Sequence, residues 1–152
     1  MVKFEKIYCP VDFSEPSLEA LERASDLADH FAGKLRVVHV IQQYPAYATA
    51  AHAGVGFSVE EYKESMTEKS KESIKDAVSK HVSDKIEVEH DILYGDPAKE
   101  VLRDAKDWNT DMLVISSHGW TVLEEIFFGS VAEKILRHSK LPVLVVPRKD
   151  GE

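Results

Sequence analysis

The sequence predicts an α/β fold in which helices cover both faces of an open parallel sheet. Five short apolar segments are typical of buried strands, and they alternate with four segments whose apolar residues recur at helical spacing. Helical connections between successive strands favour parallel pairing with right-handed crossovers. The 152 residues suffice for one hydrophobic core, so we expect a single domain over 1–152 with a frayed tail at 148–152.

The first half of the chain predicts two strands and two helices. Strands are expected within 4–11 and 35–41, and the helix between them has Ser14 as its predicted N-cap. Residues 42–57 contain no Asp, Glu, Lys or Arg, and a loop of this length is expected to be functional or mobile. A capping box of Ser58 and Glu61 then starts a long helix that ends near residue 82.

The second half predicts three strands and two helices. Residues 86–93 alternate between apolar and polar, as expected for a strand near the sheet edge. Asp96 and Pro97 start the next helix. Two short apolar strands, at 112–115 and 142–147, flank a last helix around 131–136.

Composition excludes several classes of protein. The net charge is −8 and no basic stripe is visible, so nucleic acid is not an expected partner. Cys9 is the single cysteine and is expected to be a small buried side chain. No apolar run reaches the roughly 20 residues of a membrane span, and no signal peptide is seen, so we expect a cytoplasmic protein.

A binding site is expected beyond the carboxyl ends of the strands, where open parallel sheets hold their ligands. Gly129 and Ser130 precede the last helix, whose free N–H groups favour an anion. Gly119 allows a tight turn or a close approach to a ligand. Asp12, after the first strand, is expected to meet a ligand hydroxyl or amine, or to help cap the next helix.

No catalytic or metal site is expected. His118 lacks an evident orienting carboxylate or nucleophile, so we expect it to bond to the backbone rather than to act as a base. Neither a His-Glu-x-x-His motif nor paired cysteines occur.

The spacing Ser116, two residues, Gly119, nine residues, Gly129-Ser130 resembles a motif of the universal stress protein family. Other segments are also similar to the family: Pro10-Val11-Asp12-Phe13-Ser14, His39-Val40-Ile41 and 141–146. The resemblance covers essentially the whole chain. Nucleotide-binding members of the family have glycine where this chain has Ser116. If this position requires a positive φ, serine has a cost in conformational free energy there. If the position requires only a small side chain, serine is acceptable.

The resemblance implies a Rossmann-like sheet in the order 3-2-1-4-5, related to the adenine nucleotide alpha hydrolases. It implies a pocket between the first and fourth strands for ATP, ADP or AMP, with or without magnesium. The implied nucleotide-binding residues fall into three groups along the ligand. They are Pro10, Asp12 and Val40 toward the base and ribose, Ser116 and Gly119 at the ribose and first phosphate, and Gly129, Ser130 and Val131 at the outer phosphates.

These features predict a regulatory protein of the stress response that binds an adenine nucleotide and is not an enzyme, or is at most a slow ATPase. The alternative is a dimeric interaction protein with a vestigial pocket, which Ser116 favours. A phosphoacceptor receiver domain shares the five-stranded pattern, but here Asp12 stands without the acidic neighbours that such a domain needs.

A homodimer is expected through the last strand. An apolar strand at a sheet edge, without charge or an internal proline, invites pairing with a second chain. The residues concerned are Val143, Leu144, Val145 and Val146.

Overall fold

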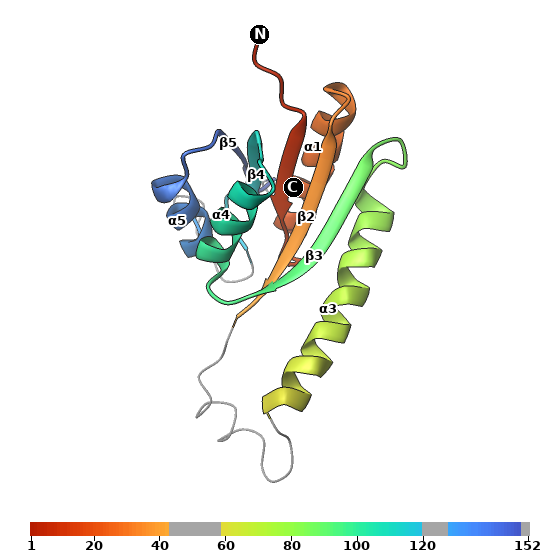
Figure 1. The fold of residues 1–152 in the computed structure, drawn as a ribbon, viewed down its shortest axis with the longest axis vertical. Helices are drawn as coiled ribbons and strands as arrows, with labels where there is room; N and C mark the ends of the chain where they lie inside the picture. The colour runs from red at the N-terminus through yellow and green to blue at the C-terminus, as the bar shows by residue number, and fades with distance from the viewer. Residues whose placement is uncertain (43–58, 120–127, 150–152) are drawn as a thin grey trace.

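The structure is a computed structural model that describes residues 1–42, 59–119 and 128–149. Five parallel strands form one sheet in the order β3-β2-β1-β4-β5, which confirms the fold class and the order that the resemblance implies (Figure 1). The strands are β1 (Lys6–Pro10), β2 (Lys34–Ile41), β3 (Glu87–Tyr94), β4 (Met112–Ser116) and β5 (Val143–Val146). The alternating strand β3 and the apolar strand β5 are the two edges.

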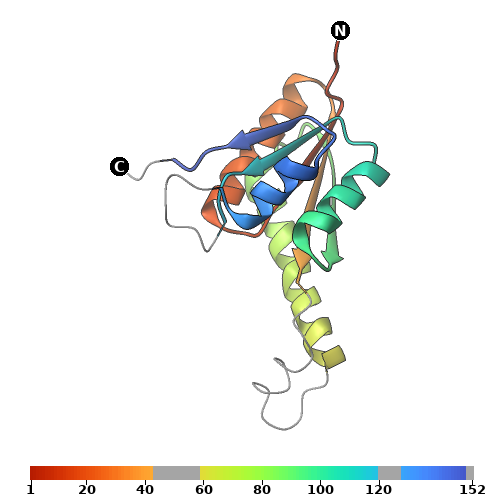
Figure 2. The same cartoon turned by 90° about the vertical axis from the view of Figure 1, so that its left-hand side faces the viewer.

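Two helices cover each face of the sheet (Figures 1 and 2). The bounds are α1 (Glu15–His30) and α3 (Val59–His81) on one face, and α4 (Pro97–Asp107) and α5 (Ser130–His138) on the other. Because successive side chains of a strand point to opposite faces, Ile7 and Cys9 pack in the cluster beneath α1 and α3, and Tyr8 packs in the cluster beneath α4 and α5. None of the described helices combines the length and the apolar character that a membrane crossing requires.

Two helices start at the caps that the sequence predicts. The Ser14 side chain accepts a hydrogen bond from the Ser17 N–H at the start of α1. Asp96 accepts one from the Lys99 N–H, at 3.0 Å, at the start of α4. Both bonds satisfy N–H groups that have no partner within their helix. Ser58 and the loop 43–57 lie outside the described residues.

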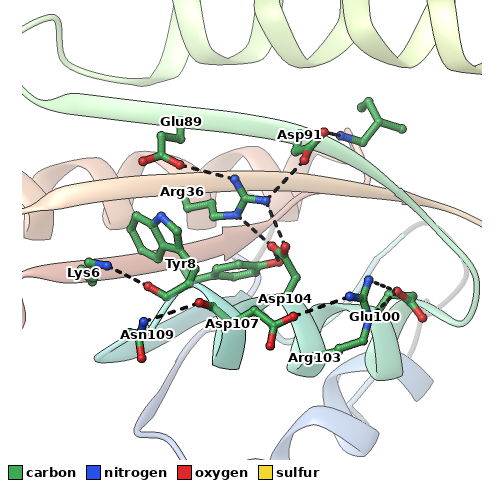
Figure 3. A network of polar contacts seen from close by, with 12 residues as sticks. Lys6, Tyr8, Arg36, Glu89, Asp91, Glu100, Arg103, Asp104, Asp107 and Asn109 are labelled. Carbon is green, nitrogen blue, oxygen red and sulfur yellow. Dashed lines mark hydrogen bonds and ion pairs between the residues drawn. The ribbon is translucent and has the colours of Figure 1, made fainter.

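A polar network fixes α4 against the sheet (Figure 3). Nε of Arg36, on β2, donates to Oδ2 of Asp104, on α4, at 2.8 Å, and the Tyr8 hydroxyl donates to the same oxygen at 2.7 Å. Arg36 also pairs with Asp91 and Glu89 of β3, at 3.4 and 3.6 Å. Partial burial opposes ionisation of Asp104, but the hydrogen bonds from Arg36 and Tyr8 outweigh it and hold the pKa of this carboxyl below its ordinary value.

Candidate functional site

A cavity of about 490 Å³ opens at the carboxyl end of the sheet. It lies beyond the ends of the central strands β1 and β4. From β1 the sheet continues in one direction through β2 and β3, and from β4 it continues in the opposite direction through β5. This reversal of strand order is the place where parallel sheets of this kind bind ligands. The segments that line the cavity from the strand ends and from α5 include 10–12, 39–42, 115–119 and 129–132.

All eight residues that the sequence singled out line this one cavity. They come from the ends of three strands and from the start of α5, and they are Pro10, Asp12, Val40, Ser116, Gly119, Gly129, Ser130 and Val131. The fold therefore brings together positions up to 121 residues apart in the chain (10 to 131). Any role of these residues toward a nucleotide stays a prediction at this stage.

Asp12 is placed by a tight turn between β1 and α1. Its Oδ1 accepts a hydrogen bond from the Ser14 backbone N–H, at 2.9 Å, and another from the Ser14 hydroxyl. Phe13 between them has a φ of 65°, in the left-handed region that few non-glycine residues adopt. The Phe13 ring lies against the His39 ring, with centroids 4.6 Å apart. Asp12 therefore supports the capping residue of α1 and lines the cavity at once.

The start of α5 faces the cavity without a side-chain cap. Gly129 is the N-cap residue, with φ −60° and ψ 156°, and within the described part of the chain no side-chain hydrogen bond caps the helix. The Gly129 N–H itself donates to the Ser117 carbonyl, at 2.8 Å. The N–H groups that follow it have no carbonyl partner within the helix, and they carry the positive end of the helix dipole. This arrangement suits an anion.

Ser116 fits its position without backbone strain. It is the last residue of β4, where it pairs with Val146 of β5. Among the described residues, the non-glycine positions with positive φ are Phe13, Ala32 and Asn109. The replacement of the motif glycine by serine therefore carries no penalty for a left-handed backbone.

His118 differs from its expected arrangement. Its Nδ1 lies 2.8 Å from the Ser117 hydroxyl, so it bonds to a side chain rather than to the backbone. The side chain is buried, and its Nε2 has no hydrogen-bond partner among the residues that the structure describes. Local sequence could not show this, because a loop histidine has many possible neighbours.

The cavity includes residues that sequence patterns assign to other roles. Tyr62 and Met66 follow the apolar face of α3, yet both line the cavity, as do Pro97 and Val101 of α4. Among the described lining residues there is no Lys or Arg, and Asp12 is the sole carboxylate. Within the described ranges no group of three His, Cys, Asp or Glu side chains could hold a metal ion.

Known proteins share this fold and much of this sequence. A model of the Universal stress protein family matches residues 3–147. The universal stress protein MJ0577 of Methanocaldococcus jannaschii is 33% identical over 99% of each chain, and its solved structure superposes with a TM-score of 0.83 over 99% of this chain and 100% of that one.

Two solved complexes are more distant in sequence. A universal stress protein of Archaeoglobus fulgidus in complex with dAMP is 22% identical, with a TM-score of 0.64, over 95% of this chain and 98% of that one. A universal stress protein in complex with cAMP is 20% identical, with a TM-score of 0.61, over 96% and 98%. The extent of the family match and the identity to MJ0577 show that this chain belongs to the universal stress protein family.

Proposed function

We propose that this protein binds an adenine nucleotide in the cavity at the carboxyl end of its sheet and acts as a regulatory protein without chemistry on the ligand. One observation carries the proposal: the uncapped start of α5, at Gly129, opens into the same cavity as Asp12 and Val40. The phosphates lie at the N–H groups of α5, and the base and ribose lie toward Asp12 and Val40. The protein belongs to the stress response, as its family name implies.

The size and lining of the cavity support a nucleotide ligand. A volume of about 490 Å³ falls in the usual range for small-molecule sites. Relatives with this fold form complexes with dAMP and cAMP, which each carry one phosphate group. Because the described lining has no Lys or Arg, backbone N–H groups and hydroxyls supply the phosphate contacts. Magnesium brought by ATP would be held chiefly by the phosphates, with Asp12 as the carboxylate in reach of the cavity.

The described polar groups favour binding over catalysis. A general base needs a partner that orients it toward the reacting group. His118 bonds to the Ser117 hydroxyl, and Asp12 bonds to Ser14. These pairings do not form a relay from a carboxylate through an imidazole to a nucleophile.

Calorimetry with ATP, ADP, AMP and adenosine tests the proposal. We expect binding of the nucleotides, and loss of binding in Gly129→Ala and Gly129→Val. A Cβ at position 129 would lie 3.7 Å from the His118 Cα and 3.8 Å from the Gly119 nitrogen, so alanine fits the free protein yet enters the space between the two loops. Valine adds branches to the same space.

Arg137→Ala is the matched control, because Arg137 is exposed near the other end of α5 and pairs only with Glu133 among the described residues. Circular dichroism checks that each variant folds. An absence of heat with every nucleotide at millimolar concentration would contradict the proposal and favour a dimeric interaction protein with a vestigial pocket. Unchanged binding by folded Gly129 variants would show that the phosphates lie elsewhere.

A further inference from the structure

We propose that the ring of Tyr62, near the start of α3, is the surface on which the base of the bound nucleotide stacks. The inference rests on the proposed function and deepens it, because it names a side chain that contacts the base and the interaction that holds the base there. The part of the ligand concerned is its planar aromatic base, which phosphates and sugar phosphates lack.

The start of α5 and the end of β2 are two strands apart at the carboxyl edge of the sheet. The Gly129 N–H donates to the carbonyl of Ser117, the residue that follows β4, so α5 begins beside the end of β4. β1 lies between β4 and β2, and two strand spacings amount to roughly 10 Å. A nucleotide whose phosphates lie at Gly129 therefore directs its base past β1 toward the end of β2.

Tyr94 fixes the first turns of α3 beside the end of β2. It is the last residue of β3 and pairs with Ile41, the last residue of β2. Its hydroxyl lies 2.6 Å from the Thr67 hydroxyl, and Nζ of Lys63 lies 4.5 Å from the centroid of its ring. Residues 63 and 67 share one face of the helix, because they are four positions apart. That face is thus turned toward the end of β3.

The neighbouring face of α3 carries Tyr62 and Met66, which are also four positions apart. Both line the cavity, together with Ile41 and Gln42 at the end of β2. Met66 is partly buried, whereas Tyr62 is 42% exposed. An aromatic ring with free surface therefore stands in the cavity wall at the place toward which the base is directed.

The chemistry of this part of the wall fits a base better than a phosphate. Residues 39–42, Tyr62 and Met66 include no Asp, Glu, Lys or Arg. The flat face of a base gains both apolar contact and π stacking on a tyrosine ring, and a thioether such as that of Met66 packs well against aromatic rings. Stacking on one aromatic side chain raises the affinity for a base by about tenfold or more.

The experiment compares the affinities for ATP and AMP of the wild type, Tyr62→Phe and Tyr62→Ala. Phenylalanine keeps the ring, and alanine removes it while favouring the helix. We expect the phenylalanine variant to bind within about twofold of the wild type and the alanine variant to bind about tenfold more weakly. Inorganic triphosphate, which has no base, should show no difference between the wild type and Tyr62→Ala.

Glu64→Ala is the matched control on the same helix. Glu64 is exposed, lies two residues after Tyr62 and is not part of the described cavity lining. Its replacement should leave both affinities unchanged. Circular dichroism checks that each variant folds.

Nuclear Overhauser effects between the Tyr62 ring protons and the adenine protons would show the contact directly. The chain has five tyrosines, and Tyr62→Phe identifies the signals of Tyr62 by their loss. We expect these effects in the complex of the wild type with either nucleotide. A residue that acted only by holding α3 in place would not produce them.

The outcomes separate the inference from the function on which it rests. Nucleotide binding by the wild type without contacts between Tyr62 and adenine, or with equal affinity in folded Tyr62→Ala, would overturn the role of Tyr62 and leave nucleotide binding intact. An equal loss of affinity in Glu64→Ala would also overturn it, because the effect would then belong to the helix. An absence of both ATP and AMP binding by the wild type would overturn both proposals.

Discussion

The carboxylate of Asp12 lies directly against the Cα of Gly119, so that a Cβ at position 119 would overlap Oδ2. The contact joins the end of β1 to the loop that follows β4. Gly119 has no positive φ, so its lack of a side chain, rather than its conformational freedom, is what the site uses. Since Oδ1 of the same carboxylate bonds to Ser14, the contact also reaches the cap of α1.

Gly119→Ala should lower the free energy of unfolding by about 1–2 kcal/mol. Asp12 must rotate to make room, and it then loses its bonds to Ser14. In an Asp12→Ala background the same change at position 119 should cost much less. Urea unfolding of the four proteins measures this coupling. Equal costs in both backgrounds would show that the two residues do not interact in solution.

Ser116→Gly should leave nucleotide affinity within about twofold and lower the free energy of unfolding by about 0.5–1 kcal/mol. The backbone at Ser116 is not left-handed, so glycine relieves no strain and adds only freedom to the unfolded chain. Calorimetry and chemical denaturation give the two quantities. A clear loss of affinity would mean that the serine hydroxyl contacts the ligand.

Asp104→Asn should lower the free energy of unfolding by about 2–4 kcal/mol at neutral pH, because it leaves Arg36 and Tyr8 with a weaker partner. The folded protein holds the pKa of Asp104 below the ordinary value of 3.8. The stabilisation is therefore complete above that value and is lost as the pH falls through the lower, folded pKa. The variant should show a flatter decline of stability in acid.

Asp107→Asn serves as the control for this change. Asp107 lies on the same helix, its side chain is 67% exposed, and it pairs with Arg103 at 3.7 Å. Its replacement should alter stability by less than about 0.5 kcal/mol. Thermal melts of both variants between acid and neutral pH make the comparison. Parallel pH profiles for wild type and Asp104→Asn would refute the role given to the network.

We propose a homodimer through β5, and Leu144→Lys should convert it to monomers. β5 is an edge strand whose described partner is β4, and Leu144 is 40% exposed. Val145 is a poor choice for this test, because it packs in the cluster beneath α4 and α5 and a charge there would also damage the core. Light scattering reports the mass at micromolar concentrations. A wild-type mass near 17.1 kDa at every concentration would reject the dimer.

The sequence predicted the order of the elements because this order depends on local patterns. Position at a strand end or before a helix singled out Asp12, Gly119, Gly129 and Ser130, whereas Pro10, Val40, Ser116 and Val131 came from the family resemblance. Ser14 and Asp96 cap their helices through neighbours three residues away, and the glycine spacing lies within one strand–loop–helix segment. The resemblance to a known family added the strand order, which no local pattern contains.

Contacts between distant segments could not be predicted in this way. Arg36 and Asp104 are 68 residues apart in the sequence. The chain has many other charged residues with which either of them could pair. Tyr62 and Met66 occupy apolar helix positions that usually indicate core packing. They line the cavity because the first turns of α3 extend past the end of the sheet. Hydrophobic periodicity shows which face of a helix is apolar, but not where along the sheet each turn lies.

That length has a thermodynamic consequence. At 23 residues α3 extends about 35 Å, whereas the eight residues of β3 span about 26 Å, and Figure 1 shows the first part of the helix projecting past the sheet. Among the described residues, the Thr67 hydroxyl bonds to the Tyr94 hydroxyl, at 2.6 Å, where the sheet ends, and Tyr62, one turn earlier, is 42% exposed. Amides in the projecting turns should therefore exchange with deuterium long before those around Ile74. Tyr62 and Met66, which line the cavity, lie in these turns, so a bound ligand is expected to make the turns more ordered. Slower deuterium exchange in these turns would then report that a ligand has bound.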